Sequence, residues 1–352
     1  MKIGVLSFNL GPNYGWILQS YALQRVLEKN GYESVYIYRR WDNSPNSIIA
    51  KLKRFVYFHF FVRPFYLFFE KKIKHTRPYT STNDLRKVVR DYDLNSVIVG
   101  SDQIWRLRYT YSLKFNYFLD FVHDPSVKKI AYAPSFGHNK WEGDVGDTAI
   151  IKSLLKQFIF VSVREKSGVD ICKNVFDVQA QWVLDPTMLL TADDYNQLLP
   201  KKTYFNVKTL ATYILDKNNE KDSFVATSAD VLNAKIYNLY PTKRMFTRFK
   251  VSIEQWLCSI RDAEFVIVDS FHGMVFSILF NKQFIAIVNK ERGAERFETI
   301  ADILGLRNRL IYDISNVNVD FFFESKIDYF KVNNLLSQRR AESLSLLMEA
   351  LK

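Results

Sequence analysis

Short apolar runs recur along this chain, and stretches with helical periodicity separate several of them. This alternation predicts strands joined by helices, so that neighbouring strands run parallel in an α/β fold. The predicted strands are Lys2–Phe8, Ser34–Tyr38, Ser96–Val99, Lys129–Ala133, Phe158–Val163, Trp182–Leu184, Thr209–Leu215, Lys235–Leu239, Phe265–Val268 and Phe284–Val288. The predicted helices include Trp16–Asn30, Ile253–Asp262, Met274–Phe280 and a C-terminal helix over Asn334–Leu351.

The chain is long enough for two such α/β halves, because 352 residues correspond to about two domains of ~150 residues each. Polar and proline-containing stretches interrupt the pattern at Thr191–Asp194 and Pro200–Lys202. We therefore expect an N-terminal domain over residues 1–195 and a second domain over 196–315. A helical tail, residues 316–352, follows them.

Charge and cysteine content narrow the function classes. Lys and Arg number 49 against 37 Asp and Glu, and the net charge of +12 suits a phosphorylated substrate, an anionic membrane or nucleic acid. We expect no nucleic-acid role, because the charge comes without a recognition motif. Cys172 and Cys258 are the only cysteines, and the histidines lack metal-ligand spacing, so we expect no metal site.

The first residues do not resemble a secretory signal. The apolar run Met1–Leu6 ends at a turn rich in Gly, Pro and Asn, before a signal peptide's hydrophobic region would be complete. We expect a cytoplasmic protein.

An aromatic and basic insertion over residues 51–74 departs from the strand-and-helix pattern. Phe55–Phe69 is almost entirely apolar or aromatic, and lysines and arginines flank it on both sides. It is too short to span a bilayer, and Arg63-Pro64 breaks its middle. Two interpretations stay open: a buried helical hairpin closing the first domain, or a peripheral anchor at the inner face of the membrane.

Polar residues follow several predicted strands, at the positions where open parallel sheets bind ligands. His272 lies where an apolar strand passes into a predicted helix, and a helix N-terminus binds anions well. A histidine there suits proton donation next to a phosphate or carboxylate, although a cap for its own helix fits the local pattern too.

Three arginines are further candidates for anion binding. Arg164 follows a strand and is placed for a bidentate contact with a carboxylate or phosphate, although a salt bridge to a carboxylate of the protein explains it equally well. Arg292 and Arg296 lie in a polar loop that runs into a helix, where solvated charge is the default interpretation. The glycine-containing turn at Gly11–Gly15 lacks GxGxxG and a P-loop lysine, so a standard dinucleotide or ATP site is not indicated.

At these motifs the sequence resembles the polysaccharide pyruvyl transferase family over nearly its whole length. The motifs that carry the resemblance are Asn13-Tyr14-Gly15 with Leu18–Gln24, Gly100–Trp105, Ala133–Gly137, Ser162–Glu165, Leu184–Thr187 and Asp269–Gly273. Each motif alone is weak, but all of them in this order are quite specific for the family.

The resemblance implies a fold like that of GT-B glycosyltransferases, with two Rossmann-like domains facing across a cleft. The implied reaction moves pyruvate from phosphoenolpyruvate to a sugar of a surface polysaccharide or its lipid-linked precursor. It forms a ketal, releases phosphate and needs no cofactor besides phosphoenolpyruvate as co-substrate.

The resemblance also implies roles for individual residues. His272 matches a histidine proposed as the general acid, and Arg164 matches an arginine proposed to bind phosphoenolpyruvate. Some members carry an arginine where this chain has Ser270, so Arg296 or Arg292 is expected to replace that charge. The expected phosphoenolpyruvate site comprises Arg164, Ser270, Gly273, Arg292 and Arg296. By analogy with GT-B enzymes, the acceptor is expected to meet Asn13, Tyr14, Gln19 and Asp102.

Two other function classes stay open. A nucleotide-sugar-dependent glycosyltransferase shares the expected fold and also prefers a basic cleft. A non-catalytic carbohydrate- or membrane-binding protein gains weight from the missing arginine at Ser270.

Overall fold

The structure, a computed structural model, describes residues 1–9, 11–40, 47–240, 251–289, 293–315 and 317–352. Two compact units divide the chain. Unit 1 comprises Met1–Val56, Phe65–Leu189 and Gln338–Lys352, and unit 2 comprises Tyr57–Pro64 and Leu190–Ser337. The change of unit after Leu189 lies close to the domain boundary predicted from the sequence. The predicted C-terminal tail contributes to both units.

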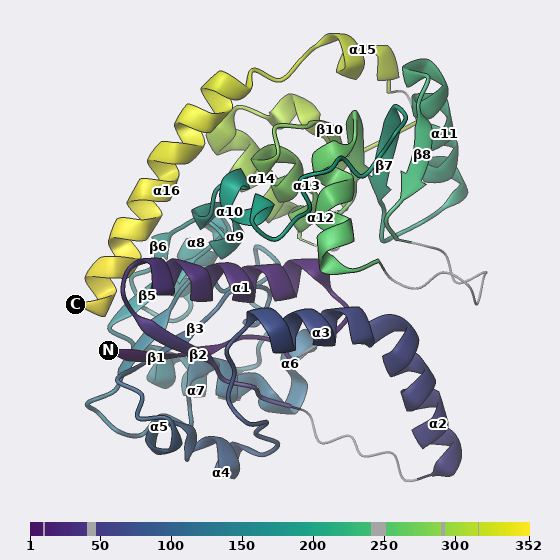
Figure 1. Cartoon of the computed structure of the whole chain (residues 1–352). Helices are drawn as coiled ribbons and strands as arrows, with labels where there is room; N and C mark the ends of the chain where they lie inside the picture. The colour runs from purple at the N-terminus through teal and green to yellow at the C-terminus, as the bar shows by residue number, and fades with distance from the viewer. Residues whose placement is uncertain (10, 41–46, 241–250, 290–292, 316) are drawn as a thin grey trace. The chain divides into compact units, whose positions relative to one another are not determined.

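Within the described residues, unit 1 contains one parallel sheet of six strands in the order β2-β1-β3-β4-β5-β6 (Figure 1). Its strands are β1 (Lys2–Leu6), β2 (Glu33–Tyr36), β3 (Ser96–Val99), β4 (Lys128–Ala131), β5 (Phe160–Val163) and β6 (Gln181–Trp182). Its helices are α1 (Tyr14–Lys29), α2 (Ile48–Tyr57), α3 (Arg63–Lys72), α4 (Thr82–Leu85), α5 (Val88–Asp91), α6 (Leu107–Thr110), α7 (Val145–Leu155), α8 (Lys166–Asn174) and α9 (Pro186–Leu189). A π-helical turn over Phe58–Val62 joins α2 to α3, and this turn belongs to unit 2 together with Tyr57, Arg63 and Pro64. In unit 1 a 3₁₀ segment spans Tyr111–Phe118.

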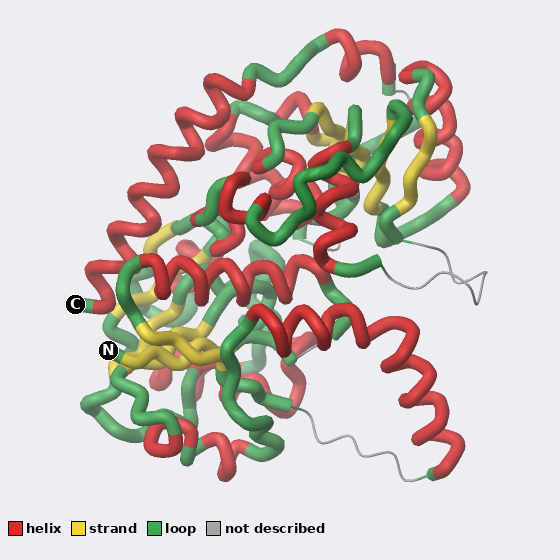
Figure 2. The backbone as a smooth tube through the Cα atoms, viewed as in Figure 1, coloured by secondary structure: helices red, strands yellow, loops and turns green. Residues whose placement is uncertain are grey.

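The described part of unit 2 holds a second parallel sheet, of five strands in the order β11-β10-β9-β7-β8 (Figure 2). The strands are β7 (Thr209–Tyr213), β8 (Lys235–Asn238), β9 (Phe265–Val268), β10 (Gln283–Ile287) and β11 (Leu310–Ile311). The helices are α10 (Ala192–Asn196), α11 (Asn219–Leu232), α12 (Ile253–Asp262), α13 (Phe271–Leu279), α14 (Ala294–Leu304), α15 (Val319–Glu324) and α16 (Tyr329–Leu351), and a 3₁₀ turn covers Arg307–Arg309. Residues of α16 from Gln338 onward belong to unit 1.

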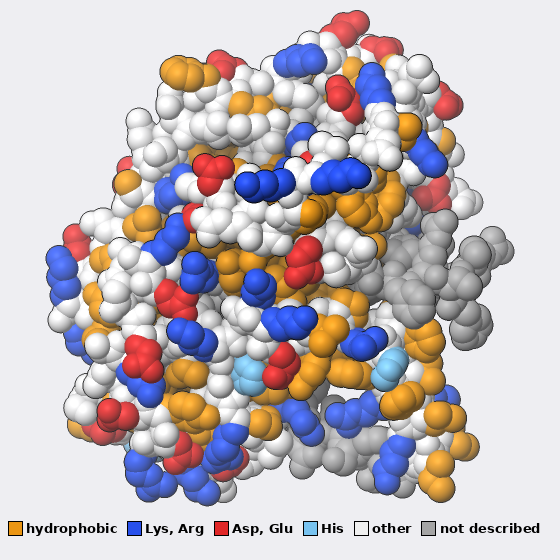
Figure 3. Space-filling view, in the orientation of Figure 1, with side chains coloured by type: hydrophobic (Ala, Val, Ile, Leu, Met, Phe, Trp, Pro, Cys, Tyr) orange, Lys and Arg blue, Asp and Glu red, His pale blue; other side chains and the backbone are white. Residues whose placement is uncertain are grey.

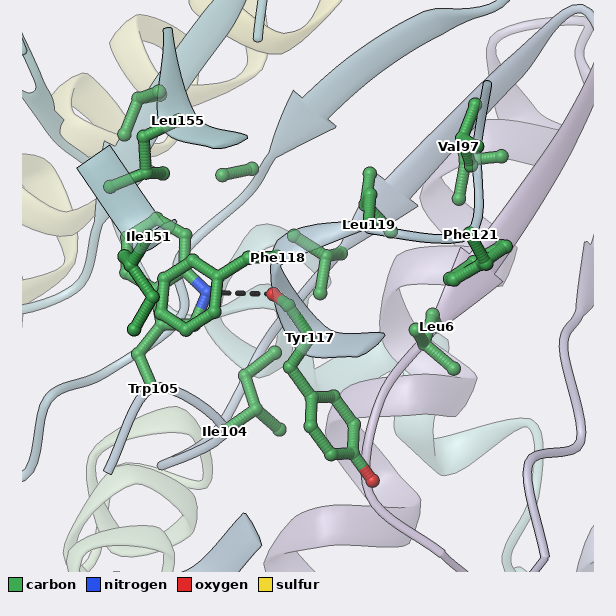
Figure 4. Close-up of a cluster of buried hydrophobic side chains, with 14 of the residues drawn as sticks. Leu6, Val97, Ile104, Trp105, Tyr117, Phe118, Leu119, Phe121, Ile151 and Leu155 are labelled. Atoms are coloured by element: carbon green, nitrogen blue, oxygen red, sulfur yellow. Dashed lines mark hydrogen bonds between the residues drawn. The ribbon is translucent and has the colours of Figure 1, made fainter. Parts of the chain in front are cut away.

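The central strands are buried on both faces, as expected where helices cover both sides of a parallel sheet. All residues of β3 and of β9 are buried. In unit 1, the Trp105 ring stacks on Phe118 at 5.1 Å between centroids, and its indole N–H donates to the Tyr117 carbonyl at 2.9 Å (Figure 4). This core holds the carboxyl ends of the strands, and the loops that follow them, in fixed positions.

The insertion predicted over residues 51–74 divides into two different parts. In α3 the rings of Phe65, Phe68 and Phe69 are buried and pack in unit 1, Phe65 against Tyr14 at 4.8 Å between centroids. In α2, by contrast, no described side chain is buried. The buried-hairpin interpretation therefore describes α3 but does not describe α2.

Candidate functional site

A buried ion network lies where the strands of the unit 1 sheet end. Arg164 directly follows β5, and its side chain has no exposed surface. Its Nη1 donates to Asp185 Oδ2 at 2.6 Å, and its Nη2 donates to Asp102 Oδ1 at 2.8 Å. Burial disfavours the charged guanidinium, but the negative charges of Asp102, Asp185 and Glu165 outweigh this effect and the pKa of Arg164 is raised. Arg164 thus forms salt bridges to two carboxylates of the protein. This is one of the two roles that the sequence left open for Arg164, the other being contact with a ligand.

Gln19 belongs to the same network. Its side chain accepts a hydrogen bond from the Ser101 backbone N–H at 2.9 Å and donates to Ser7 Oγ at 2.9 Å. The Ser101 hydroxyl in turn contacts Asp185 Oδ2 at 3.2 Å. Three residues singled out from the sequence, Gln19, Asp102 and Arg164, are therefore brought together.

Asp102 is the member of this network that retains some solvent exposure, at 11% of its side chain. Its backbone adopts φ 76°, in the left-handed region that residues other than glycine rarely adopt. Asp102 Oδ1 also accepts the Gln103 backbone N–H at 2.8 Å. The strained backbone and these hydrogen bonds fix its carboxylate at the rim of the buried network.

The other two expected acceptor residues occupy the start of α1. Asn13 is exposed and caps the helix by accepting the Trp16 backbone N–H at 3.1 Å. Tyr14 is fully buried, and its ring packs against Phe65. These contacts give Asn13 and Tyr14 roles in starting and packing the helix.

In unit 2 the corresponding position, after β9, begins a helix. The sequence predicts that helix from Met274, but α13 starts at Phe271 because Ser270 acts as its N-cap. The Ser270 hydroxyl accepts the Gly273 backbone N–H at 3.0 Å. A Cβ at Gly273 would lie 2.8 Å from that hydroxyl oxygen, so a side chain there would disturb the cap. His272 consequently lies within the first turn and is nearly buried, at 8% exposed.

Arg296, at the start of α14, approaches the same turn. Its guanidinium carbon lies 5.4 Å from the centroid of the Phe271 ring, and the Phe271 and His272 rings lie 5.2 Å apart. The structure therefore brings together three of the five expected phosphoenolpyruvate-binding residues, Ser270, Gly273 and Arg296, with His272, the expected general acid. Arg292, the alternative source of charge, lies outside the described residues.

Two partners in these clusters are not singled out by the sequence. In the sequence Asp185 belongs to the motif Leu184–Thr187 but is not named as a site residue. Its position just after β6, at the end of the sheet where ligands bind, is the signal that could have identified it. Lys221 pairs with Asp269 at 2.9 Å, while Asp269 also accepts backbone N–H groups of Leu215 and Asp216. Lys221 lies in the first turn of a helix remote in sequence, where nothing local indicates this contact.

Comparison with solved structures gives likeness in fold at low sequence identity. A UDP-GlcNAc 2-epimerase from Neisseria meningitidis bound to UDP-GlcNAc is 10% identical with a TM-score of 0.53, over 100% of this chain and 99% of that one. A putative UDP-N-acetylglucosamine 2-epimerase from Listeria monocytogenes is 9% identical with a TM-score of 0.51, over 97% of this chain and 90% of that one. An E. coli heptosyltransferase with ADP reaches a TM-score of 0.46 at 10% identity, over 92% of this chain and 98% of that one.

The likeness to the two epimerases, with the two parallel sheets and the C-terminal helix, confirms the expected GT-B-like α/β fold class. The comparison with curated protein sequences gives no match. The model of one family, polysaccharide pyruvyl transferase, matches residues 13–291, which include every motif that carried the resemblance. On this match, the chain belongs to the polysaccharide pyruvyl transferase family.

Proposed function

We propose that this protein transfers pyruvate from phosphoenolpyruvate to two hydroxyls of a sugar, in a surface polysaccharide or its lipid-linked precursor. A proton adds to the methylene carbon of phosphoenolpyruvate, and one sugar hydroxyl attacks the resulting cationic carbon. The bond from that carbon to the phosphate oxygen then breaks, and the second hydroxyl closes the ketal. One hydroxyl proton balances the proton gained by the methylene carbon, and the other leaves with the phosphate.

The observation that carries this proposal, beside the family match, is the cluster at the first turn of α13. An imidazole, a guanidinium and a capped helix N-terminus gather there, through His272, Arg296 and Ser270. The helix end and the arginine suit the phosphate and carboxylate of the donor. In this proposal His272 protonates the methylene carbon, and Arg296 supplies the charge that some members carry at position 270. Ser270 and Gly273 shape the turn against which the donor binds.

The buried network of unit 1 suits acceptor binding. Asp102 would accept a hydrogen bond from a sugar hydroxyl at the rim, while Gln19 holds the loop that carries it. Asn13 and Tyr14 would complete the acceptor side from the start of α1.

Arg164 admits two roles: direct contact with phosphoenolpyruvate, or positioning of Asp102. Its complete burial and its two carboxylate partners favour the second role. A nucleotide-sugar glycosyltransferase is the alternative enzyme, and nucleotide binding distinguishes it.

Calorimetric titration of phosphoenolpyruvate, UDP and CMP tests the proposal. We expect phosphoenolpyruvate alone to bind wild type, and Arg296→Ala to weaken binding by about 10- to 100-fold through loss of a charge-assisted contact. Arg307→Ala is the matched control, since Arg307 is exposed and pairs with Asp302. Unchanged affinity in Arg296→Ala, and in the double variant with Arg292→Ala, would exclude these arginines from the site. Tight UDP or CMP binding without a response to phosphoenolpyruvate would assign the protein to glycosyl transfer.

A further inference from the structure

Helix α2 carries a stripe of large apolar side chains exposed to solvent. Its members recur at the spacing of one helix face and are Ile48 (84% exposed), Ile49 (69%), Leu52 (62%), Phe55 (61%) and Val56 (41%). A contiguous apolar surface of this kind is typical of an interaction site rather than of a free surface. We call these five residues the α2 stripe.

Basic residues border the α2 stripe. At about 100° per residue, Leu52 lies near the centre of the apolar face, and Lys51 and Lys53 lie on either side of it. Arg54 lies on the opposite face. Figure 3 shows hydrophobic side chains together with lysines and arginines over α2, at the lower right.

The sequence segment that contains α2 carries no acidic residue to offset this charge. From Asn43 to Phe69 the sequence has no Asp or Glu. Two copies of α2 packed through their stripes would bring lysines together without a carboxylate from this segment to pair with them. An anionic surface with an apolar interior meets both requirements, charge at the border and an apolar phase at the centre.

We propose that α2 lies on the surface of an anionic lipid bilayer, with the α2 stripe inserted among the acyl chains and Lys51 and Lys53 among the headgroups. Within the part of the chain that the structure describes, no helix is long and apolar enough to cross a bilayer. Contact through α2 is therefore contact with one leaflet. The proposal does not depend on the reaction that the protein catalyses.

Vesicle flotation of the full chain tests the proposal. Wild type is expected to float with vesicles of equimolar phosphatidylcholine and phosphatidylglycerol, and much less with phosphatidylcholine alone. Leu52→Glu with Phe55→Glu should lower binding by about tenfold or more, because charge enters the apolar face. Val145→Glu with Phe330→Glu is the matched control, since both side chains are more than 80% exposed and lie outside α2.

A double charge reversal isolates the electrostatic contribution to vesicle binding. Lys51→Glu with Lys53→Glu should lower binding to anionic vesicles by about fivefold or more for each charge. Lys201→Glu with Lys202→Glu makes the same change in net charge at two exposed lysines of unit 2. Equal losses in both pairs would show that net charge alone drives binding and would overturn the role of α2.

A fluorescent label reports the orientation of the helix directly. The native cysteines are both buried, and burial raises the pKa of Cys172 to about 12 and that of Cys258 above its usual value, so both react slowly. An environment-sensitive dye on Leu52→Cys should shift to the blue with anionic vesicles, whereas the same dye on Arg54→Cys should not.

The proposal is overturned if wild type fails to float, if Leu52→Glu with Phe55→Glu floats as wild type does, or if both labelled positions respond alike. Light scattering measures the oligomeric state and so tests self-association as the alternative. A wild-type dimer that the same double variant makes monomeric would assign the α2 stripe to self-association instead. Circular dichroism should be unchanged in every variant, because all the substituted side chains are exposed.

Discussion

Arg164 and Asp185 form an ion pair of 2.6 Å in which neither side chain has solvent-exposed surface. Asp102 binds the other terminal nitrogen of the same guanidinium. A buried charge of this kind is costly to leave uncompensated. The three residues come from loops after three different strands, so their pairing ties those loops together.

Removal of one partner should therefore destabilise unit 1. We expect Arg164→Ala and Asp185→Asn each to lower the free energy of unfolding by about 3–5 kcal/mol, measured by urea denaturation. Arg25→Ala removes a pair of the same kind at the surface, 2.8 Å from Glu28, and should cost less than about 1 kcal/mol. Equal losses in Arg164→Ala and Arg25→Ala would show that the network contributes little.

His272 should matter for turnover and not for donor binding. If it donates the proton, His272→Ala should lower kcat by about 10²- to 10⁴-fold and leave the Kd for phosphoenolpyruvate essentially unchanged. Phosphate release with a panel of oligosaccharide acceptors measures the first quantity, and calorimetry measures the second. His123→Ala, at an exposed histidine, is the control and should behave as wild type. A large rise in Kd for His272→Ala would make His272 a binding residue instead.

Ser270 should have separable effects on stability and on donor binding. Ser270→Ala removes the cap of α13 and should cost about 1 kcal/mol of unfolding free energy, while Ser270→Asn should preserve the cap. Ser270→Asp also caps the helix but adds negative charge, so it should fold normally and bind phosphoenolpyruvate more weakly than Ser270→Asn does. Equal affinity in the Asn and Asp variants would place the donor away from this turn.

The contacts of Asp262 predict that this residue contributes to the stability of unit 2 in a pH-dependent way. Burial raises its pKa, but hydrogen bonds from Arg261 and from the Tyr204 backbone N–H outweigh this and hold the pKa below the usual range. A carboxylate with a lowered pKa in the folded state stabilises above its unfolded pKa of about 4, and this contribution disappears as pH falls through the folded value.

Asp262→Asn should therefore cost about 1–3 kcal/mol at pH near 7 and progressively less in acid below about pH 4. Urea unfolding across this range measures the difference from wild type. Asp230→Asn, at an exposed aspartate, is the control and should cost little at any pH. A constant cost for Asp262→Asn at all pH values would contradict the assignment.

The central parallel strands are well predicted from the sequence alone, because β3 and β9 are short apolar runs in which every residue is buried. The predicted strands Ser96–Val99 and Phe265–Val268 coincide with β3 and β9, and the predicted helix Ile253–Asp262 coincides with α12. The sequence pattern starts α13 too late, since Phe271-His272-Gly273 lacks a strong local helix signal and the Ser270 cap decides the boundary.

The pairing of Arg164 could not be predicted in the same way. Its partners lie 21 and 62 residues away in sequence, and only the order of the strands brings them together. The division of the aromatic insertion into a buried part, α3, and an exposed part, α2, has a similar cause. Burial of Phe65, Phe68 and Phe69 depends on rings of Tyr14, Tyr21 and Tyr36, which are remote in sequence, while the apolar residues of α2 are left exposed.

Unit 1 is assembled from segments that the ribosome makes at very different times. The Ser343 hydroxyl, on α16, accepts the backbone N–H of Leu184 at 3.0 Å, and Arg340 donates to the Met188 carbonyl at 2.8 Å. All of unit 2 after Leu189 is synthesised before these contacts can form. During synthesis, the residues that follow β6 therefore lack these contacts until Gln338–Lys352 has been made.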